Sequence, residues 1–177
     1  HAMGSSADVT ATFCATLADE WRRAGIGHVV LSPGSRSTPL ALALCAAEEP
    51  AVHVHHDERS AGFMALGIGL ASGRPAIVLT TSGTAAAELH PAVVEAHQAR
   101  VPLIVVTADR PPELQDVGAP RPSTRPTCSA TRCAGSPHPA CPTTTPGHVA
   151  PAAARAVAES TGATPGPVHL NLAFRGP

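Results

Sequence analysis

Short apolar runs rich in β-branched residues alternate with segments of helical length along most of this chain, and this alternation constrains its fold most strongly. The runs have the length and composition of buried strands, and a small-residue turn, Ser32 to Ser37, follows the first of them. Because parallel strands need helical crossovers, the pattern predicts an α/β domain whose mostly parallel sheet carries helices on both faces, a Rossmann-like three-layer sandwich. The expected strands cover residues 28–31, 51–55, 75–81, 103–107 and 168–172.

Helical periodicity places the expected helices. Val9, Phe13, Leu17 and Trp21 recur at every fourth residue and form one apolar stripe, which Gly25 can end. The remaining expected helices begin at a Ser37 or Thr38 cap, follow Glu58, and cover residues 84–98 and 152–160.

Glycines interrupt the helical pattern that follows Glu58. Gly62, Gly67 and Gly69 lie within an apolar segment, although each glycine costs a helix roughly 1 kcal/mol relative to alanine. The pattern therefore predicts close approach by another backbone, either within the domain or from a second subunit.

Composition restricts the class of partner. A length of 177 residues suits one domain, and a net charge of −1 with 14% charged residues gives no reason to expect nucleic acid or a membrane surface. No apolar run approaches the roughly 20 residues needed to cross a bilayer, and no secretory signal is evident, so we expect a cytoplasmic protein. Residues 1–6, HAMGSS, resemble vector sequence, which leaves residues 7–177 as the expected domain.

Ser35 and Arg36 lie in the small-residue turn between the first expected strand and the next helix. Free backbone N–H groups at a helix N-terminus attract anions, and the guanidinium fork of Arg36 suits a carboxylate or a phosphate. A merely tight turn with a solvated arginine explains the same residues equally well.

Glu58 lies where the second expected strand passes into a helix, within the segment VHHDERSAG. Local sequence alone favours a structural interpretation: Asp57 caps the helix, Glu58 interacts with the helix dipole and Arg59 faces water. Three other turns, within residues 32–40, 80–89 and 107–114, also close expected strands. Because the carboxyl ends of parallel strands share one sheet edge, where α/β proteins bind ligands, the four turns together favour a functional role for Glu58.

Four longer segments resemble the N-terminal pyrimidine-binding domain of thiamine-diphosphate enzymes. Within these enzymes the resemblance is closest to the menaquinone-pathway family of 2-succinyl-5-enolpyruvyl-6-hydroxy-3-cyclohexene-1-carboxylate synthases, to which SPGSRSTPL and TADRPPEL are specific. The resemblance covers residues 8–119 and 152–175. The segments are GHVVLSPGSRSTPLALAL, HVHHDERSAGFMALGIGLASGRPA, TTSGTAAAELHPAVVEA and PLIVVTADRPPELQDVGA.

The resemblance implies roles for individual residues. Glu58 matches the catalytic glutamate that hydrogen-bonds a ring nitrogen of the cofactor aminopyrimidine, and we expect its carboxyl to be buried, since a desolvated carboxyl shares a proton readily. Ser35 and Arg36 match residues that contact the substrate carboxylate. The residues that match the turn lining the cofactor pocket are Thr81, Ser82 and Gly83.

The resemblance also implies a reaction and a larger assembly. Family members decarboxylate 2-oxoglutarate and add the succinyl-semialdehyde carbanion to isochorismate. Their Mg2+ (or Mn2+) is bound by a C-terminal domain with a GDG-type motif that nothing in this chain matches, and their active sites form between two subunits of a homodimer or homotetramer. We therefore expect this chain to be inactive alone and to hold no metal; His55 and His56 lack a third ligand and are expected to be structural.

Residues 120–150 depart from this pattern. Eight of the nineteen prolines lie between Pro120 and Pro151, and apolar periodicity is lost. A disordered linker would explain the prolines. A metal site would explain the clustered cysteines and histidines, although their spacing is not that of a zinc motif and does not suggest a disulfide framework. The residues concerned are Cys128, Cys133, Cys141, His138 and His148.

A lost nucleotide near the Pro120 codon is the hypothesis that we favour for this stretch. All twelve basic residues are arginine and Asn171 is the only asparagine, which indicates a GC-rich gene. GC-rich codons for these residues, read one base out of step, can encode QTIDQTHLFGDAVRWFPAPGVPDDDPG, which resembles the family's continuation. Arg121 would then replace a substrate-contacting glutamine. Sequencing the gene from codon 110 onward tests this, because a continuous reading frame through the observed residues would refute it.

Two other functions remain open at this point. The chain could be a truncated or frameshifted, non-catalytic module that mainly associates with itself through sheet edges and the glycine-lined helix face. It could also be the same domain of another thiamine-diphosphate carboligase or decarboxylase, against which the SPGSR and ADRPPEL segments argue.

Overall fold

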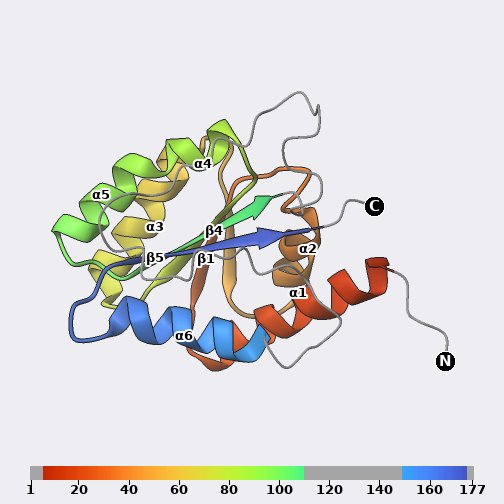
Figure 1. Cartoon of the computed structure of the whole chain (residues 1–177). Coiled ribbons are helices and arrows are strands. Elements are labelled where there is room, and N and C mark those ends of the chain that lie inside the picture. Colours follow the sequence, from red (N-terminus) through yellow and green to blue (C-terminus); the bar gives the residue numbers. More distant parts are fainter. Residues whose placement is uncertain (1–5, 110–148, 175–177) are drawn as a thin grey trace.

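A computed structural model describes residues 6–109 and 149–174, which form a five-stranded, wholly parallel sheet between two layers of helices (Figure 1). The strand order is β2-β1-β3-β4-β5. The α/β sandwich predicted from the alternating pattern is thus confirmed. The elements are α1 (Ser6–Arg23), β1 (His28–Leu31), α2 (Thr38–Ala46), β2 (Ala51–Val54), α3 (Glu58–Ser72), β3 (Ala76–Thr80), α4 (Thr84–Glu88), α5 (His90–Gln98), β4 (Leu103–Asp109), α6 (Val149–Thr161) and β5 (Pro167–Ala173).

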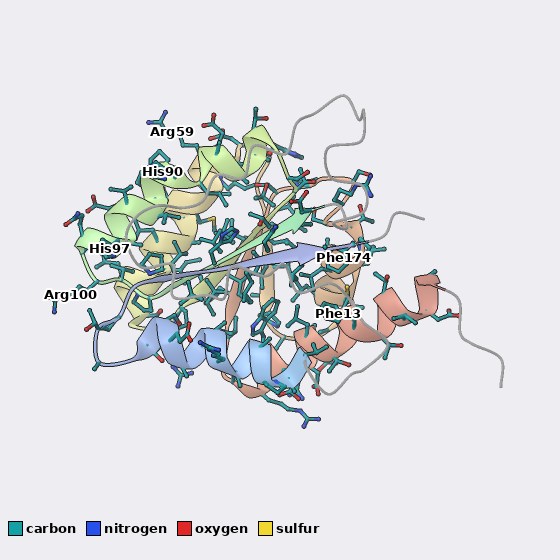
Figure 2. The ribbon with its side chains drawn as sticks, in the orientation of Figure 1. Phe13, Arg59, His90, His97, Arg100 and Phe174 are labelled. Atoms are coloured by element: carbon teal, nitrogen blue, oxygen red, sulfur yellow. The ribbon has the colours of Figure 1, made fainter. Side chains whose placement is uncertain are left out.

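Each face of the sheet has its own apolar core. Helices α1, α2 and α6 cover one face, and α3 and α5 cover the other (Figure 1). Successive strand residues point to opposite faces, so Val29 and Leu31 enter the first core and Val30 enters the second. In the first core the rings of Phe13 and Phe174 pack edge to face with their centroids 6.2 Å apart, and this contact joins α1 to the end of β5 (Figure 2).

The order of the strands creates a switch point between β1 and β3. These strands are neighbours, but the chain leaves β1 towards β2 and leaves β3 towards β4. Their connecting helices therefore depart in opposite directions, and in open α/β sheets this is the position, outside the carboxyl ends of the strands, at which ligands bind.

One expected helix is divided in two, and another begins at the expected cap residue, Ser37, without a side-chain cap bond. The helix expected over residues 84–98 is divided into α4 and α5 at Leu89, because Pro91 has no N–H to donate to the preceding turn. Ser37 occupies the N-cap position of α2 but makes no cap bond; its hydroxyl donates to the Gly34 carbonyl instead, at 2.9 Å.

Residues 110–148 lie outside the described part of the chain, as do residues 1–5 and 175–177. The proposed frameshift therefore stays a prediction. Irregular structure was expected as far as residue 150, but α6 begins at Val149, whose side chain is buried in the first core. No helix within the described ranges is long and apolar enough to cross a membrane.

Helix α3 begins where its sequence predicts. The Asp57 carboxylate accepts a hydrogen bond from the Ser60 backbone N–H at 2.9 Å and another from the Ser60 hydroxyl. The hydroxyl bond, followed by the backbone bond, holds the pKa of Asp57 below its ordinary value. The structural role expected for Asp57 is confirmed, and this cap fixes Glu58 as the first residue of the helix.

Close packing accounts for two of the three glycines of α3. A β-carbon on Gly62 would lie 3.0 Å from the Ala92 β-carbon of α5, and one on Gly69 would lie 2.5 Å from the Pro102 carbonyl oxygen. A β-carbon on Gly67 would meet nothing within 4 Å in the described structure. The predicted close approach is therefore confirmed within the domain for Gly62 and Gly69.

We predict that Gly69→Ala destabilises the chain by about 1–3 kcal/mol, because the added methyl group would overlap the Pro102 carbonyl oxygen. The matched control is Gly67→Ala, which should stabilise the same helix by about 1 kcal/mol. Urea denaturation of both variants measures the two effects. Equal changes in the free energy of unfolding would contradict the packing of α3 against residues 101–102.

We predict that the Asp57 cap stabilises the chain in a pH-dependent way. Because folding lowers the pKa of Asp57, its contribution is complete above the unfolded value of about 3.9 and is lost as the pH falls through the folded value. Asp57→Ala should therefore be less stable than the wild type near pH 7, with the difference shrinking below about pH 4. Thermal unfolding at several pH values measures this, and Asp57→Asn, which caps without titrating, serves as the control.

Candidate functional site

The turns that follow β2, β1 and β3 lie side by side at one edge of the sheet. Two backbone hydrogen bonds continue the ladders beyond the strand ends: His55 N–H donates to the Leu31 carbonyl and Ser32 N–H to the Leu79 carbonyl, each at 2.9 Å. The turns carry all of the site residues expected from the sequence. In spatial order these are Glu58 after β2, Ser35 and Arg36 after β1, and Thr81, Ser82 and Gly83 after β3.

The turns after β1 and β3 touch at Gly34. A β-carbon on Gly34 would lie 2.5 Å from the Thr81 β-carbon and 2.7 Å from its methyl carbon. Only glycine allows this approach, so residue 34 fixes how closely the two turns meet across the switch point. Thr81 itself is half-buried there.

Hydrogen bonds to one carbonyl group shape the turn after β1. The Gly34 carbonyl accepts from the Ser37 N–H at 3.2 Å, from the Ser37 hydroxyl at 2.9 Å and from the Thr38 hydroxyl at 3.1 Å. Ser35 is exposed and Arg36 half-buried at the apex of this turn. Since Arg36 forms no ion pair within the described residues, its guanidinium group can receive an external anion.

Glu58 is half-buried, so the expectation of a buried carboxyl is wrong for this chain alone. The reason is its position: β2 is the edge strand of the sheet and pairs only with β1. The Asp57 cap holds the Glu58 backbone at the start of α3, where the helix dipole favours a negative charge. Arg59 is exposed, as the structural interpretation of this segment expected (Figure 2).

Two hydroxyl groups form part of the site that the sequence analysis missed. Ser32 and Thr80 close β1 and β3, and their side chains are 1% and 0% exposed. Neither hydroxyl oxygen has a hydrogen-bond partner within the described structure. A buried hydroxyl without a partner is costly, so these two groups mark the ends of β1 and β3 as a position whose hydrogen bonding is incomplete in the described structure. The sequence carries a signal for them, because a serine follows the apolar run of β1 and a threonine ends that of β3.

Gly83 and the two histidines complete the description of this edge. Gly83 has φ of +76° and ψ of −136°, a conformation that is essentially limited to glycine, and it precedes α4. His55 is half-buried and His56 exposed. Within residues 6–109 and 149–174 no three side chains of the metal-binding types converge as a metal site would require.

Comparison with known proteins shows the family to which this chain is similar. Residues 11–127 match the family model described as thiamine pyrophosphate enzyme, N-terminal TPP binding domain. The chain is also similar to curated 2-succinyl-5-enolpyruvyl-6-hydroxy-3-cyclohexene-1-carboxylate synthases. It is 50% identical to that of Halobacterium salinarum (strain ATCC 29341 / DSM 671 / R1) over 169 residues, which are 91% of this chain and 28% of the relative.

Two further synthases give the same result. Identity is 50% over 172 residues to that of Roseiflexus castenholzii, covering 93% of this chain and 29% of the relative, and 49% over 164 residues to that of Thermobifida fusca, covering 91% and 30%. The chain thus spans less than a third of the length of these relatives. The family match covers most of the sheet and all three turns described above, and the chain therefore belongs to the thiamine pyrophosphate enzyme family, as an N-terminal TPP binding domain.

Proposed function

We propose that this chain is the pyrimidine-binding part of a 2-succinyl-5-enolpyruvyl-6-hydroxy-3-cyclohexene-1-carboxylate synthase, in which Glu58 hydrogen-bonds the aminopyrimidine of thiamine diphosphate. The observation that carries the proposal is the meeting of the Glu58, Arg36 and Thr81 turns at the β1–β3 switch point. The similarity to curated synthases, all of them much longer than this chain, supports the same assignment.

The residues of the site are compatible with such a cofactor. The Ser32 and Thr80 hydroxyls, where β1 and β3 end, are buried without partners in the described structure, and Gly34 lets the turn after β1 lie directly against Thr81. The turn formed by Thr81, Ser82 and Gly83 is half-buried at the same edge and would line the cofactor pocket. Bound thiamine diphosphate would supply the carbon nucleophile for decarboxylation and carboligation, while Glu58 would hold and return a proton at the pyrimidine nitrogen.

Ser35 and Arg36 would bind the substrate. Both proposed substrates, 2-oxoglutarate and isochorismate, carry carboxylates, and a planar guanidinium group can bind a carboxylate through two parallel hydrogen bonds. The exposure of Ser35 and the absence of an ion pair to Arg36 within the described chain support this assignment.

The remaining parts of the proposed enzyme lie outside this chain. Mg2+ would bind to a C-terminal domain, and a second subunit of a cytoplasmic homodimer or homotetramer would cover the half-buried Glu58. Such cover would desolvate the carboxyl group and favour proton sharing. We infer that this chain alone does not turn over substrate.

One observation favours a second candidate, a non-catalytic module that associates with itself. Phe63 and Leu70 on α3 are 42% and 70% exposed, and the open position Gly67 lies between them on one helix face. Apolar stripes of this kind occur at helix–helix contacts between subunits. This alternative predicts association of the chain without any affinity for the cofactor.

We predict that Glu58→Gln slows activation of the cofactor by about 10²–10⁴-fold, because glutamine cannot exchange a proton with the pyrimidine. The assay uses a chimera in which residues 7–177 replace the matching part of the Thermobifida fusca synthase. Exchange of the thiazolium C2 proton, followed by NMR with thiamine diphosphate and Mg2+, reports activation without turnover. In the same chimera Arg36→Gln should weaken binding of 2-oxoglutarate.

The matched control for this assay is Glu95→Gln on the exposed surface of α5, which should leave C2 exchange unchanged. A folded chimera that binds no thiamine diphosphate would rule out the proposed function and leave self-association as the better explanation. Equal exchange rates in Glu58→Gln and the wild type would remove Glu58 from the mechanism.

A further inference from the structure

Four polar side chains at the carboxyl ends of β4 and β5 form a chain of hydrogen bonds that the proposed function does not use. The Thr107 hydroxyl oxygen lies 2.8 Å from His169 Nε2 and 2.7 Å from Asn171 Oδ1. Asn171 Nδ2 lies 3.4 Å from Asp109 Oδ2, the longest of the three links. Strand register explains the grouping, because Thr107 pairs with Asn171 and Val105 with His169, which puts the four side chains on one face of the sheet.

The number of available protons fixes the direction of donation along these hydrogen bonds. A threonine hydroxyl has one proton, and Asn171 Oδ1 can only accept, so Thr107 donates to Asn171. The second contact of Thr107 must then be one in which its oxygen accepts, and His169 must donate through Nε2–H. The direction therefore runs from His169 through Thr107 and Asn171 to the Asp109 carboxylate.

The opposite direction is disfavoured by the charge of Asp109. Reversal would require the Asn171 amide to flip, so that its nitrogen donates to Thr107 and its oxygen faces Asp109 Oδ2. Two acceptor oxygens would then face each other beside a carboxylate that is only 7% exposed. The Asp109 carboxylate thus orients Asn171, Asn171 orients the Thr107 hydroxyl, and the Thr107 oxygen selects which nitrogen of His169 carries the proton.

These hydrogen-bonded side chains end at the same sheet edge as the candidate site. Thr107 pairs with Thr80, the last residue of β3, so Asp109 lies at the sheet edge from which the turn of residues 81–83 departs. The Phe174 backbone N–H also donates to the Asp109 carbonyl at 3.0 Å, which ties the ends of β4 and β5 together. Burial lowers the pKa of His169, so its ring is neutral near pH 7 and carries a single N–H.

We propose that His169, Thr107 and Asn171 are positioning residues, which act together as a directed hydrogen-bond chain to hold the Asp109 carboxylate in one orientation at the ligand-binding edge of the sheet. The significance of that edge for a ligand rests on the proposed function. The chain of hydrogen bonds and its dependence on the charge of Asp109 are properties of this protein alone, without cofactor or substrate.

NMR of the uniformly 15N-labelled chain at about pH 7.5, above the ordinary histidine pKa of about 6.5, tests the proposal. We expect His169 to carry its proton on Nε2, with that proton and the Thr107 hydroxyl proton both protected from exchange with water. Thr107→Val, which keeps the shape and removes the hydroxyl, should speed exchange of the Nε2 proton at least roughly tenfold, and Thr107→Ser should restore protection. His97 on α5 provides an internal control that none of these changes should affect.

Asp109→Asn tests the direction. Without the carboxylate charge Asn171 can take both orientations, so His169 should become a mixture of its two tautomers while the fold persists. A wild-type His169 protonated on Nδ1 would overturn the proposal, as would a tautomer and an exchange rate that neither Asp109→Asn nor Thr107→Val alters. The wild-type measurement decides the assignment even if a variant fails to fold, and because no ligand is present, failure of the proposed function would leave this result unaffected.

Discussion

The parallel pairing of β1 with β3 is the constraint on which the rest of this structure depends. It brings together strands whose connections leave in opposite directions, and this places three turns that are far apart in the sequence at one edge of the sheet. The contact of Gly34 with Thr81 sets how closely two of these turns meet, and the buried hydroxyls of Ser32 and Thr80, where β1 and β3 end, have no partner in the described structure.

Small residues take much of the role that aromatic side chains have in other cores. Aromatic residues make up only 2% of the sequence, and α3 packs on the sheet and on α5 through residues such as Ala61, Gly62, Ala65 and Gly69. Helices with so little side-chain volume approach closely, so a single added methyl group meets backbone atoms. The tight packing explains why α3 has glycine at residues 62 and 69, although glycine lowers helix propensity.

Sequence reasoning predicted the elements of this fold better than the environment of its candidate site. The apolar runs predicted β1, β3 and β4, because a strand that is covered by helices on both faces is recognisable from a continuous apolar segment. Asp57 predicted the start of α3. The half-burial of Glu58 was not predicted, because burial depends on which strand lies at the edge of the sheet, and no local pattern encodes strand order. The hydrogen bonds of Thr107 with His169 and Asn171 were missed for the same reason, since they join residues more than sixty positions apart.

The edge position of β2 has a consequence for how the candidate site can lose its geometry. This strand of four residues pairs with β1 alone, and it leads directly to Glu58. Short edge strands open locally at a lower free energy than central ones, so native-state fluctuations should release β2 before the strands that form the two cores. Opening of β2 would therefore move Glu58 away from the Arg36 and Thr81 turns in molecules whose two cores are still folded. In this protein, a normal melting temperature need not mean an intact site.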